Sequence, residues 1–117
     1  MNIEEYRNYC LSKSFVTEAF PFDDKVLVFK VGRKIFAATS IDVFSFINLK
    51  CDPTVALDLR EKYKGVKPGW HSNKKHWNSV YLNSDVPHQL FYTLIDASYG
   101  LVYQTLTKKA RHELQNG

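Results

Sequence analysis

The stretch from Pro68 to Asn78 holds the residue types best suited to contacting a ligand. It contains two tryptophans, two histidines, two lysines and two asparagines. Lysine contacts phosphate, serine and asparagine bond phosphate or base edges, and flat rings stack on bases. On a hairpin arm, such residues would form a wing able to lie in a nucleic-acid groove. The candidates from this region and its approach are Lys67, Trp70, His71, Asn73, Lys74, Lys75, His76, Trp77 and Asn78.

Each aromatic candidate also has a structural interpretation. A tryptophan that opens a strand is more often a core residue than a ligand contact, and Trp77 opens a predicted strand. For Trp70 the two interpretations are about equally weighted. His71 and His76 have neither a cysteine nor a carboxylate close by in the sequence, so a metal site there would need a ligand from elsewhere. We expect no metal site and no cofactor.

The basic excess of the chain is concentrated in the same region. The whole chain carries 16 Lys and Arg against 12 Asp and Glu, a formal net charge of +4. No acidic residue lies between Lys62 and Ser84, and this segment contains five of the lysines. A local positive excess attracts phosphate, although a lysine-rich loop can also be simply solvated.

Motifs for catalysis are missing from the sequence. It contains no glycine-rich phosphate loop, no nucleophile elbow and no HExxH zinc motif. Cys51 with His71 or His76 could form a nucleophile pair, but the adjacent Asp52 opposes thiolate formation. Asp23 with Asp24 suggests a turn more than an acid/base pair. We therefore expect no enzymatic activity and no catalytic residue.

The composition indicates one ordered domain over residues 1–117. Hydrophobic residues make up 44% of the chain, enough to bury a core. No apolar run approaches the roughly 20 residues of a membrane span, and acids follow the first residue where a signal peptide would be basic. The two cysteines lack CxxC spacing, which argues against a disulfide framework. We expect a cytoplasmic protein, monomeric or weakly dimeric, that does not bind membranes.

The first half of the chain is predicted to form a helix and a hairpin. A capping box headed by Asn2 starts a helix over residues 2–12. Strands are predicted over residues 25–31 and 34–39. The two-residue loop Gly32-Arg33 has glycine first, which favours a type II′ turn.

A third strand and a second helix follow. The strand is predicted over residues 43–50, with Ile47 and Leu49 inside. Asp52-Pro53 is a strong helix start, and Gly65 ends the helix after Tyr63. The core face of this helix is predicted to hold Val55, Ala56, Leu59 and Tyr63.

The second half contains the arm, a strand and a long helix. Residues 66–76 are interpreted as an irregular arm with a short strand near Trp70, and residues 77–82 as a strand. Asp85 with Pro87 starts the last long helix, and a polar tail begins at Thr107. The order α-β-β-β-α-β(β)-α predicts a two-layer α+β fold, with an antiparallel sheet of four or five strands and helices on one face.

The sequence resembles the MmcQ/YjbR family over nearly its whole length. The segments that carry this resemblance are Phe20-Pro21-Phe22, Val28 to Gly32, Asn48 to Pro53, Leu59-Arg60-Glu61, Pro68 to His71, Asn73 to Asn78 and Ser98-Tyr99. Two positions depart from the family pattern. Trp70 replaces the more usual Tyr or His, which keeps a stacking ring. Gly100 replaces a polar residue, which affects the stability of the last helix.

The resemblance implies an α+β fold like those of secretion chaperones and CyaY. It also implies DNA binding through a double-wing arrangement. The family pattern matches Lys50, Lys74, Lys75, His76, Trp77 and Asn78, so the resemblance adds Lys50 to the candidates. The CyaY-like relatives suggest iron binding by an acidic first helix, but Glu4 and Glu5 alone are too few oxygen ligands.

Two functions from different classes remain after this reasoning. The first is a non-enzymatic DNA-binding protein that uses the basic aromatic arm with weak sequence preference, since no recognition helix is evident. The second is a protein- or peptide-binding module that adds a strand at a sheet edge. An exposed apolar patch at Phe44 and Phe46 would favour the second function.

Overall fold

The computed structural model describes residues 1–116 and contains six strands and four helices. The strands are β1 (Val16–Ala19), β2 (Val26–Val31), β3 (Lys34–Ser40), β4 (Phe46–Lys50), β5 (Val66–Pro68) and β6 (Trp77–Tyr81). They form one antiparallel sheet in the order β1-β2-β3-β4-β6-β5. The helices are α1 (Ile3–Leu11), α2 (Pro53–Lys62), α3 (His88–Gln104) and α4 (Lys108–Asn116).

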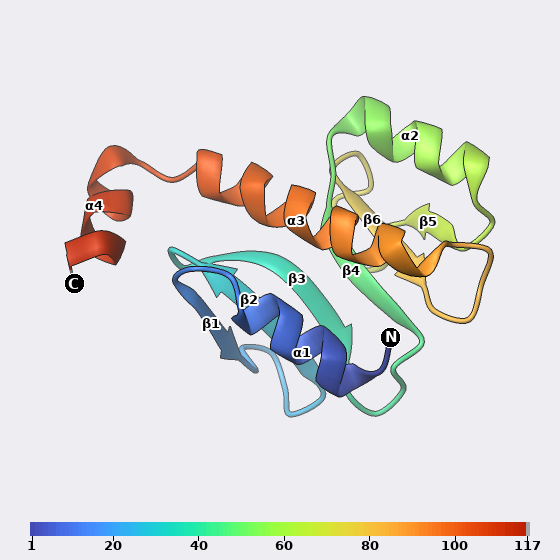
Figure 1. Ribbon diagram of the computed structural model, residues 1–117, viewed down its shortest axis with the longest axis horizontal. Coiled ribbons are helices and arrows are strands. Elements are labelled where there is room, and N and C mark those ends of the chain that lie inside the picture. Colours follow the sequence, from blue (N-terminus) through green and yellow to red (C-terminus); the bar gives the residue numbers. More distant parts are fainter. Residues whose placement is uncertain (117) are drawn as a thin grey trace.

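The helices α1, α2 and α3 pack on one face of the sheet. Figure 1 shows α1 and α3 crossing in front of the strands, with α2 beyond them near β5 and β6. The predicted two-layer α+β fold is confirmed, although the sheet has six strands rather than four or five. Within residues 1–116, no helix combines the length and apolar character needed to cross a membrane.

Alternation along the strands puts one set of side chains against the helices. The buried members of this set include Leu27, Phe29, Val31, Ile47, Leu49 and Val80. The burial of Ile47 and Leu49 confirms the predicted inner face of that strand. Helix α3 contributes Phe91, Ile95 and Val102 to the same core.

A buried serine ties α3 to the two central strands. Ser98 is fully buried, and its hydroxyl donates to the carbonyl of Phe36 on β3 at 2.6 Å. The same oxygen accepts from the backbone N–H of Lys50 on β4 at 2.8 Å. One hydroxyl therefore satisfies two backbone groups and sets the position of the Lys50 end of β4.

The two strands absent from the sequence prediction, β1 and β5, are the edges of the sheet. They have four and three residues, and each pairs with one neighbour only. β5 replaces the start of the predicted irregular arm, and the short strand expected near Trp70 is a turn. Such short, half-exposed strands show little periodicity and form because a longer strand supplies the pairing.

The Gly32-Arg33 turn differs from its predicted type. Gly32 has φ 56° and Arg33 has φ 71°, so both central residues lie in the left-handed region, as in a type I′ turn. The predicted type II′ turn requires positive φ only at the first position. The twist of a type I′ turn matches that of the flanking strands, which favours it here despite the cost at Arg33.

The predicted limits and faces of two elements also need correction. β4 begins at Phe46 rather than at residue 43, because the N–H of Ser45 bonds to the carbonyl of Val43 in a turn. Val55, predicted to face the core, is 46% exposed. It lies on the solvent side of the first turn of α2, whereas Ala56, the next residue, is buried.

Candidate nucleic-acid interface

On the face of the sheet opposite the helices, here called the open face, the strands carry lysines and no carboxylate. Successive side chains of a strand point to opposite faces of the sheet, so the residues that alternate with those packed against the helices point outward on the open face. Three of these are lysines, one each on β2, β4 and β5. The outward residues are Thr17, Ala19, Val26, Val28, Lys30, Ile35, Ala38, Ser40, Phe46, Asn48, Lys50, Lys67, Trp77, Ser79 and Tyr81.

Two loops fold over the open face and enclose a cleft. They are residues 20–25 between β1 and β2, and residues 69–76 between β5 and β6. The cavity has a volume of about 520 Å³. Its lining includes Phe22 from the first loop and Trp70 from the second, which are 73% and 56% exposed. This open-face cleft is lined by Phe22, Asp23, Val26, Val28, Ile35, Ala38, Asn48, Trp70, His71, Ser72, Asn73 and Trp77.

A closed set of hydrogen bonds holds the backbone of Trp70 against the sheet. The N–H of Trp70 donates to Ser79 Oγ at 3.0 Å, and Asn48 Nδ2 donates to the carbonyl of Trp70 at 3.1 Å. The hydroxyl of Ser79 donates to Asn48 Oδ1 and completes the ring. The indole also meets Phe46 edge-on, with ring centroids 5.9 Å apart. Trp70 is therefore exposed to solvent but fixed in place.

Arg60 of α2 holds the other end of the same loop. Its Nε donates to Asn78 Oδ1 at 2.7 Å, and its Nη2 donates to the carbonyls of Trp77, at 3.2 Å, and Lys74. Lys74 itself donates from Nζ to the carbonyl of Gly69 at 2.9 Å. The loop is thus fixed from the helix side by Arg60 and internally by Lys74.

The structure brings together four of the predicted site residues and separates others. Trp70, His71, Asn73 and Trp77 line the open-face cleft. Lys50 lies opposite Trp77 in the β4–β6 register, and Lys67 Nζ lies over the Tyr81 ring, 5.2 Å from its centroid. Both lysines therefore share the open face with the cleft.

The remaining candidates have other surroundings. Lys75 lines a separate cavity of about 250 Å³ beside α2. His76 is half-buried, and its carbonyl accepts from the N–H of Cys51 at 2.7 Å. Asn78 is 2% exposed on the helix side of the sheet, bonded to Arg60. Asn78 therefore supports the loop from beneath and is too buried to contact a ligand.

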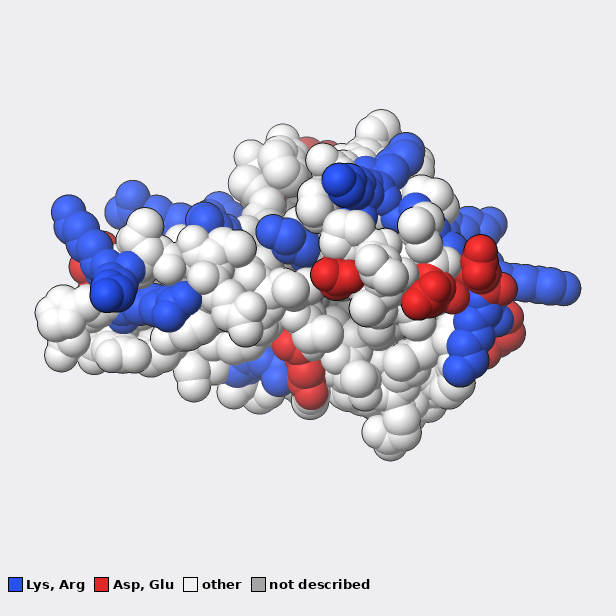
Figure 2. Space-filling model, turned by 90° about the horizontal axis from the view of Figure 1, so that it is seen from above, with Lys and Arg blue, Asp and Glu red and all other residues white. Residues whose placement is uncertain are grey.

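The basic run in the sequence does not form an unopposed basic patch in space. Exposed acids of α2 and its cap lie near it, namely Asp52, Asp58 and Glu61. Figure 2 shows basic and acidic side chains next to one another at the α2 end and mostly basic ones at the α4 end. The α4 end contains Arg33, Lys34, Lys108, Lys109 and Arg111 with Glu113 as its one acid.

Comparison with known proteins places the chain in a family. The YjbR family model matches residues 11–101, most of the described chain. The chain belongs to the YjbR family. The uncharacterized protein YbdF of Escherichia coli O157:H7 is 38% identical over 97% of this chain and 94% of its own. The uncharacterized protein YjbR of Escherichia coli K12 is 33% identical over 95% of each chain.

Solved structures show that the YjbR fold is present along nearly the whole chain. The crystal structure of Deinococcus radiodurans protein DR2400 superimposes with a TM-score of 0.90 at 38% identity, covering 97% of this chain and 88% of the other. A Pseudomonas syringae protein gives a TM-score of 0.73 at 26% identity, covering 87% and 99%. The names of these relatives state no activity, so function must be argued from the geometry.

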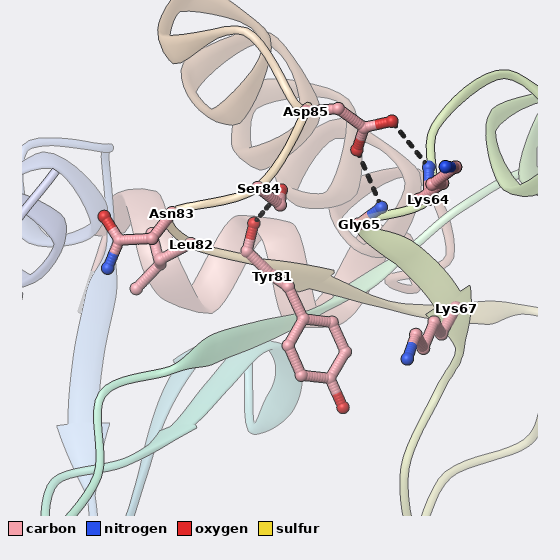
Figure 3. Close-up of a pocket in the computed structure, with 8 residues that line it drawn as sticks. All are labelled: Lys64, Gly65, Lys67, Tyr81, Leu82, Asn83, Ser84 and Asp85. Atoms are coloured by element: carbon pink, nitrogen blue, oxygen red, sulfur yellow. Dashed lines mark hydrogen bonds between the residues drawn. The ribbon is translucent and has the colours of Figure 1, made fainter.

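A second cavity lies at the β5 edge of this YjbR domain. It has a volume of about 440 Å³ and is lined by Lys64, Gly65, Lys67 and residues 81–85. Figure 3 shows the Asp85 carboxylate bonded to the backbone N–H groups of Lys64 and Gly65, both at 2.8 Å. Asp85 was predicted to start the last helix, but α3 begins at His88 and Asp85 instead caps the end of the α2–β5 connection. The backbone N–H groups of Lys64 and Gly65 are therefore already occupied.

The backbone N–H groups of Lys64 and Gly65 hold the pKa of Asp85 below its ordinary value, and the bond from Lys64 has the larger effect. Because the pKa of Asp85 is lower in the folded chain than in the unfolded chain, these hydrogen bonds stabilise the fold fully above the unfolded pKa of about 4. This stabilisation is lost as the pH falls through the pKa of Asp85 in the folded chain. We expect Asp85→Asn to lower the urea midpoint at neutral pH and to match the native chain in acid. Asp24→Asn, which removes an exposed carboxylate elsewhere, is the control. A midpoint difference that persists unchanged in acid would contradict this assignment.

Cys51 has the surroundings of a structural thiol. It is 8% exposed, and burial, followed by the charge of Asp52, raises the pKa of its thiol. A raised pKa keeps the Cys51 thiol protonated at neutral pH, which disfavours nucleophilic attack.

The predicted turn at Asp23 is also present, since its carboxylate accepts from the N–H groups of Lys25 and Val26. Residues 1–116 contain no group of three His, Cys, Asp or Glu side chains placed to hold a metal.

Several residues that build the site were not among its predicted members, including Phe22, Lys30, Asn48, Arg60 and Ser79. All of these except Ser79 lie in the segments that carry the family resemblance, but none was given a role in the site. A signal was available for Asn48 and Ser79, because polar side chains inside short apolar strands often bond to a crossing loop. No local signal identifies Phe22 as a neighbour of the 69–76 loop.

Proposed function

We propose that this protein binds DNA on the open face of its sheet, without enzymatic activity and with weak sequence preference. The observation that carries the proposal is the open-face cleft, which holds exposed aromatic rings from two loops beside a sheet surface with three lysines and no outward carboxylate on its strands. Bases stack on aromatic side chains for about 1–3 kcal/mol each. The lysines supply contacts to phosphate.

In this proposal, the loops of residues 20–25 and 69–76 make the DNA contacts that were predicted for the wings. Trp70 is fixed by Asn48 and Ser79, so little entropy is lost when a base packs on its exposed ring. Helices α1, α2 and α3 pack on the opposite face, and α4 lies beside the Gly32-Arg33 turn. No helix of residues 1–116 therefore lines the open-face cleft, where it could read a major groove. Phosphate contacts and stacking are largely independent of sequence, which gives the weak preference.

The structure offers less support for the alternative, a peptide-binding module. The exposed patch that would favour it is missing, since Phe44 and Phe46 are both half-buried. Phe44 packs on Tyr6 with ring centroids 5.5 Å apart, and Phe46 packs between Trp70 and Tyr81. The free sheet edges, β1 and β5, are only four and three residues long.

The affinity for DNA should fall as the salt concentration rises, with a slope set by three contacts between lysine and phosphate. Three neutralised phosphates give a slope of about −2 to −3 for log K against log salt, or a loss of roughly 20- to 40-fold between about 50 and 200 mM. Fluorescence anisotropy with a labelled oligonucleotide measures this slope. Substituting glutamine for the three open-face lysines should bring it close to zero; these are Lys30, Lys50 and Lys67.

The matched control removes the same charge from other surfaces. It substitutes glutamine for Lys62, Lys108 and Lys109. We expect this variant to keep most of the salt slope. Equal slopes in both variants would mean that only net charge matters, and a greater loss in the control would move the binding site to the α4 end. Either result, or the absence of DNA binding by the native chain, would overturn the proposal.

A further inference from the structure

The open-face cleft has the lining of a pocket for a flat ring. We infer that it accepts one unstacked nucleobase, so that the protein prefers single-stranded or locally opened DNA to intact duplex. This inference rests on the proposed function and names its substrate class. The cavity volume of about 520 Å³ falls in the range of roughly 300–1,000 Å³ usual for small-ligand sites.

The lining is apolar beneath and aromatic at the sides. Val26, Val28 and Ala38 from two adjacent strands lie in its base, whereas Phe22 and Trp70 come from the two loops above them. A base inside a duplex presents only its edge in a groove, since its faces are covered by neighbouring bases. A recess with aromatic sides can therefore be filled only by a base that has left the stack.

The charges favour a base inside the cleft and phosphates outside it. Asp23 lines the cleft, and its Oδ1 accepts from the N–H groups of Lys25 and Val26 at 2.8 and 2.9 Å. A carboxylate there repels phosphate but can accept from an exocyclic amino group through its second oxygen. Outside the cleft, the open-face strands carry Lys30, Lys50 and Lys67 for the backbone on either side.

The polar rim offers further contacts to the edge of a base. His71 and Asn73 line the cleft and are exposed. His71 has φ 52°, a conformation of the left-handed region, and its ring meets that of Trp70 at 71° with centroids 3.9 Å apart. Asn73 Oδ1 accepts from the N–H of Lys75 at 3.0 Å, which orients its amide nitrogen away from that bond.

The test compares three DNA ligands with one pair of variants of the full chain. The ligands are a single strand, a blunt duplex, and the same duplex with one unpaired base. At equal salt, the first and third should bind about 5- to 150-fold more tightly than the second, from the 1–3 kcal/mol of one stacked base. Phe22→Ala should weaken binding of the first and third ligands more than binding of the duplex, and so remove most of this preference. Phe20→Ala, which removes an exposed ring of the same loop outside the cleft lining, should change neither these affinities nor the preference.

Failure of this inference can be distinguished from failure of the proposed function. Equal affinity for all three ligands, unchanged in Phe22→Ala, would overturn the base pocket while leaving DNA binding on the open face intact. No binding to any ligand would overturn both. If an apolar peptide binds and Phe22→Ala abolishes that binding while no DNA binds, the cleft is a peptide site and both proposals are wrong. Phe22 is 73% exposed, so its replacement leaves the core unaltered.

Discussion

Replacing Ser98 with alanine should destabilise the fold by roughly 2–4 kcal/mol, because two backbone groups lose their partner at once. The carbonyl of Phe36 and the N–H of Lys50 both bond to the hydroxyl of Ser98, which is fully buried between α3 and the sheet. Water cannot replace the hydroxyl without opening the helix–sheet contact. The change should appear as a lower urea midpoint with an unchanged slope.

Helix α3 provides its own control for this substitution. The hydroxyl of Thr93 bonds to the carbonyl of Gln89 within the helix and is exposed. Thr93→Ala therefore removes a hydroxyl from the same element without orphaning a group in the core, and we expect a change within about 0.5 kcal/mol. Equal effects of the two substitutions would mean that the Ser98 bonds contribute nothing beyond helix propensity.

Replacing Arg60 with alanine should reduce both stability and DNA binding. Arg60 bonds to buried Asn78 Oδ1 and to two carbonyls of the 69–76 loop and its exit. Hydrogen bonds to a charged group are worth about 1.5–3 kcal/mol each, and we expect a net loss of about 2–3 kcal/mol. Once the Lys74 end of the loop is released, the loop that carries Trp70 and Asn73 is less rigid, so DNA affinity should fall by about 10-fold.

Two further variants separate the position of the loop from the charge of Arg60. Arg60→Lys keeps the charge but cannot supply the fork that reaches three acceptors, so it should not restore affinity. Lys62→Ala removes a charge from the same helix without touching the loop and should have a small effect. Hydrogen exchange of residues 69–76 should quicken in Arg60→Ala at temperatures where the rest of the chain stays protected. Full affinity in Arg60→Lys would show that charge alone matters.

The central part of the fold could be predicted from the sequence because its signals are local. The Asn2 capping box and the Asp52 N-cap are both present, and Ile47 and Leu49 are buried as their alternation requires. The edge strands β1 and β5 could not be predicted in this way. Their residues adopt strand geometry through pairing with β2 and β6, and nothing within the short segments themselves encodes that pairing.

The candidate site could be predicted only where one loop supplies it. Trp70, His71 and Asn73 are neighbours in the sequence and remain together at the cleft. Phe22 joins them only because the sheet order brings the β1–β2 loop onto the same face as the β5–β6 loop, a relation that requires the complete topology.

The surroundings of the basic run could not be predicted for the same reason. A run without acids in the sequence, from Lys62 to Ser84, lies beside the acids of α2 in space. Asn78 shows the equivalent effect for burial. Its side chain looked available in a polar motif, but the alternation of β6 turns it towards Arg60.

The end of the molecule that carries α4 has a consequence for how an encounter with a polyanion begins. Leu106 packs on Gly32, and Lys34 bonds to Thr105, so the cations of α4 and of the neighbouring turn are held together. The molecule is 42 Å long, with a mostly positive end and an opposite end of mixed sign. Such an uneven distribution of charge is an electric dipole. The field of a nearby polyanion would exert a torque on it that turns the α4 end forward before any short-range contact forms.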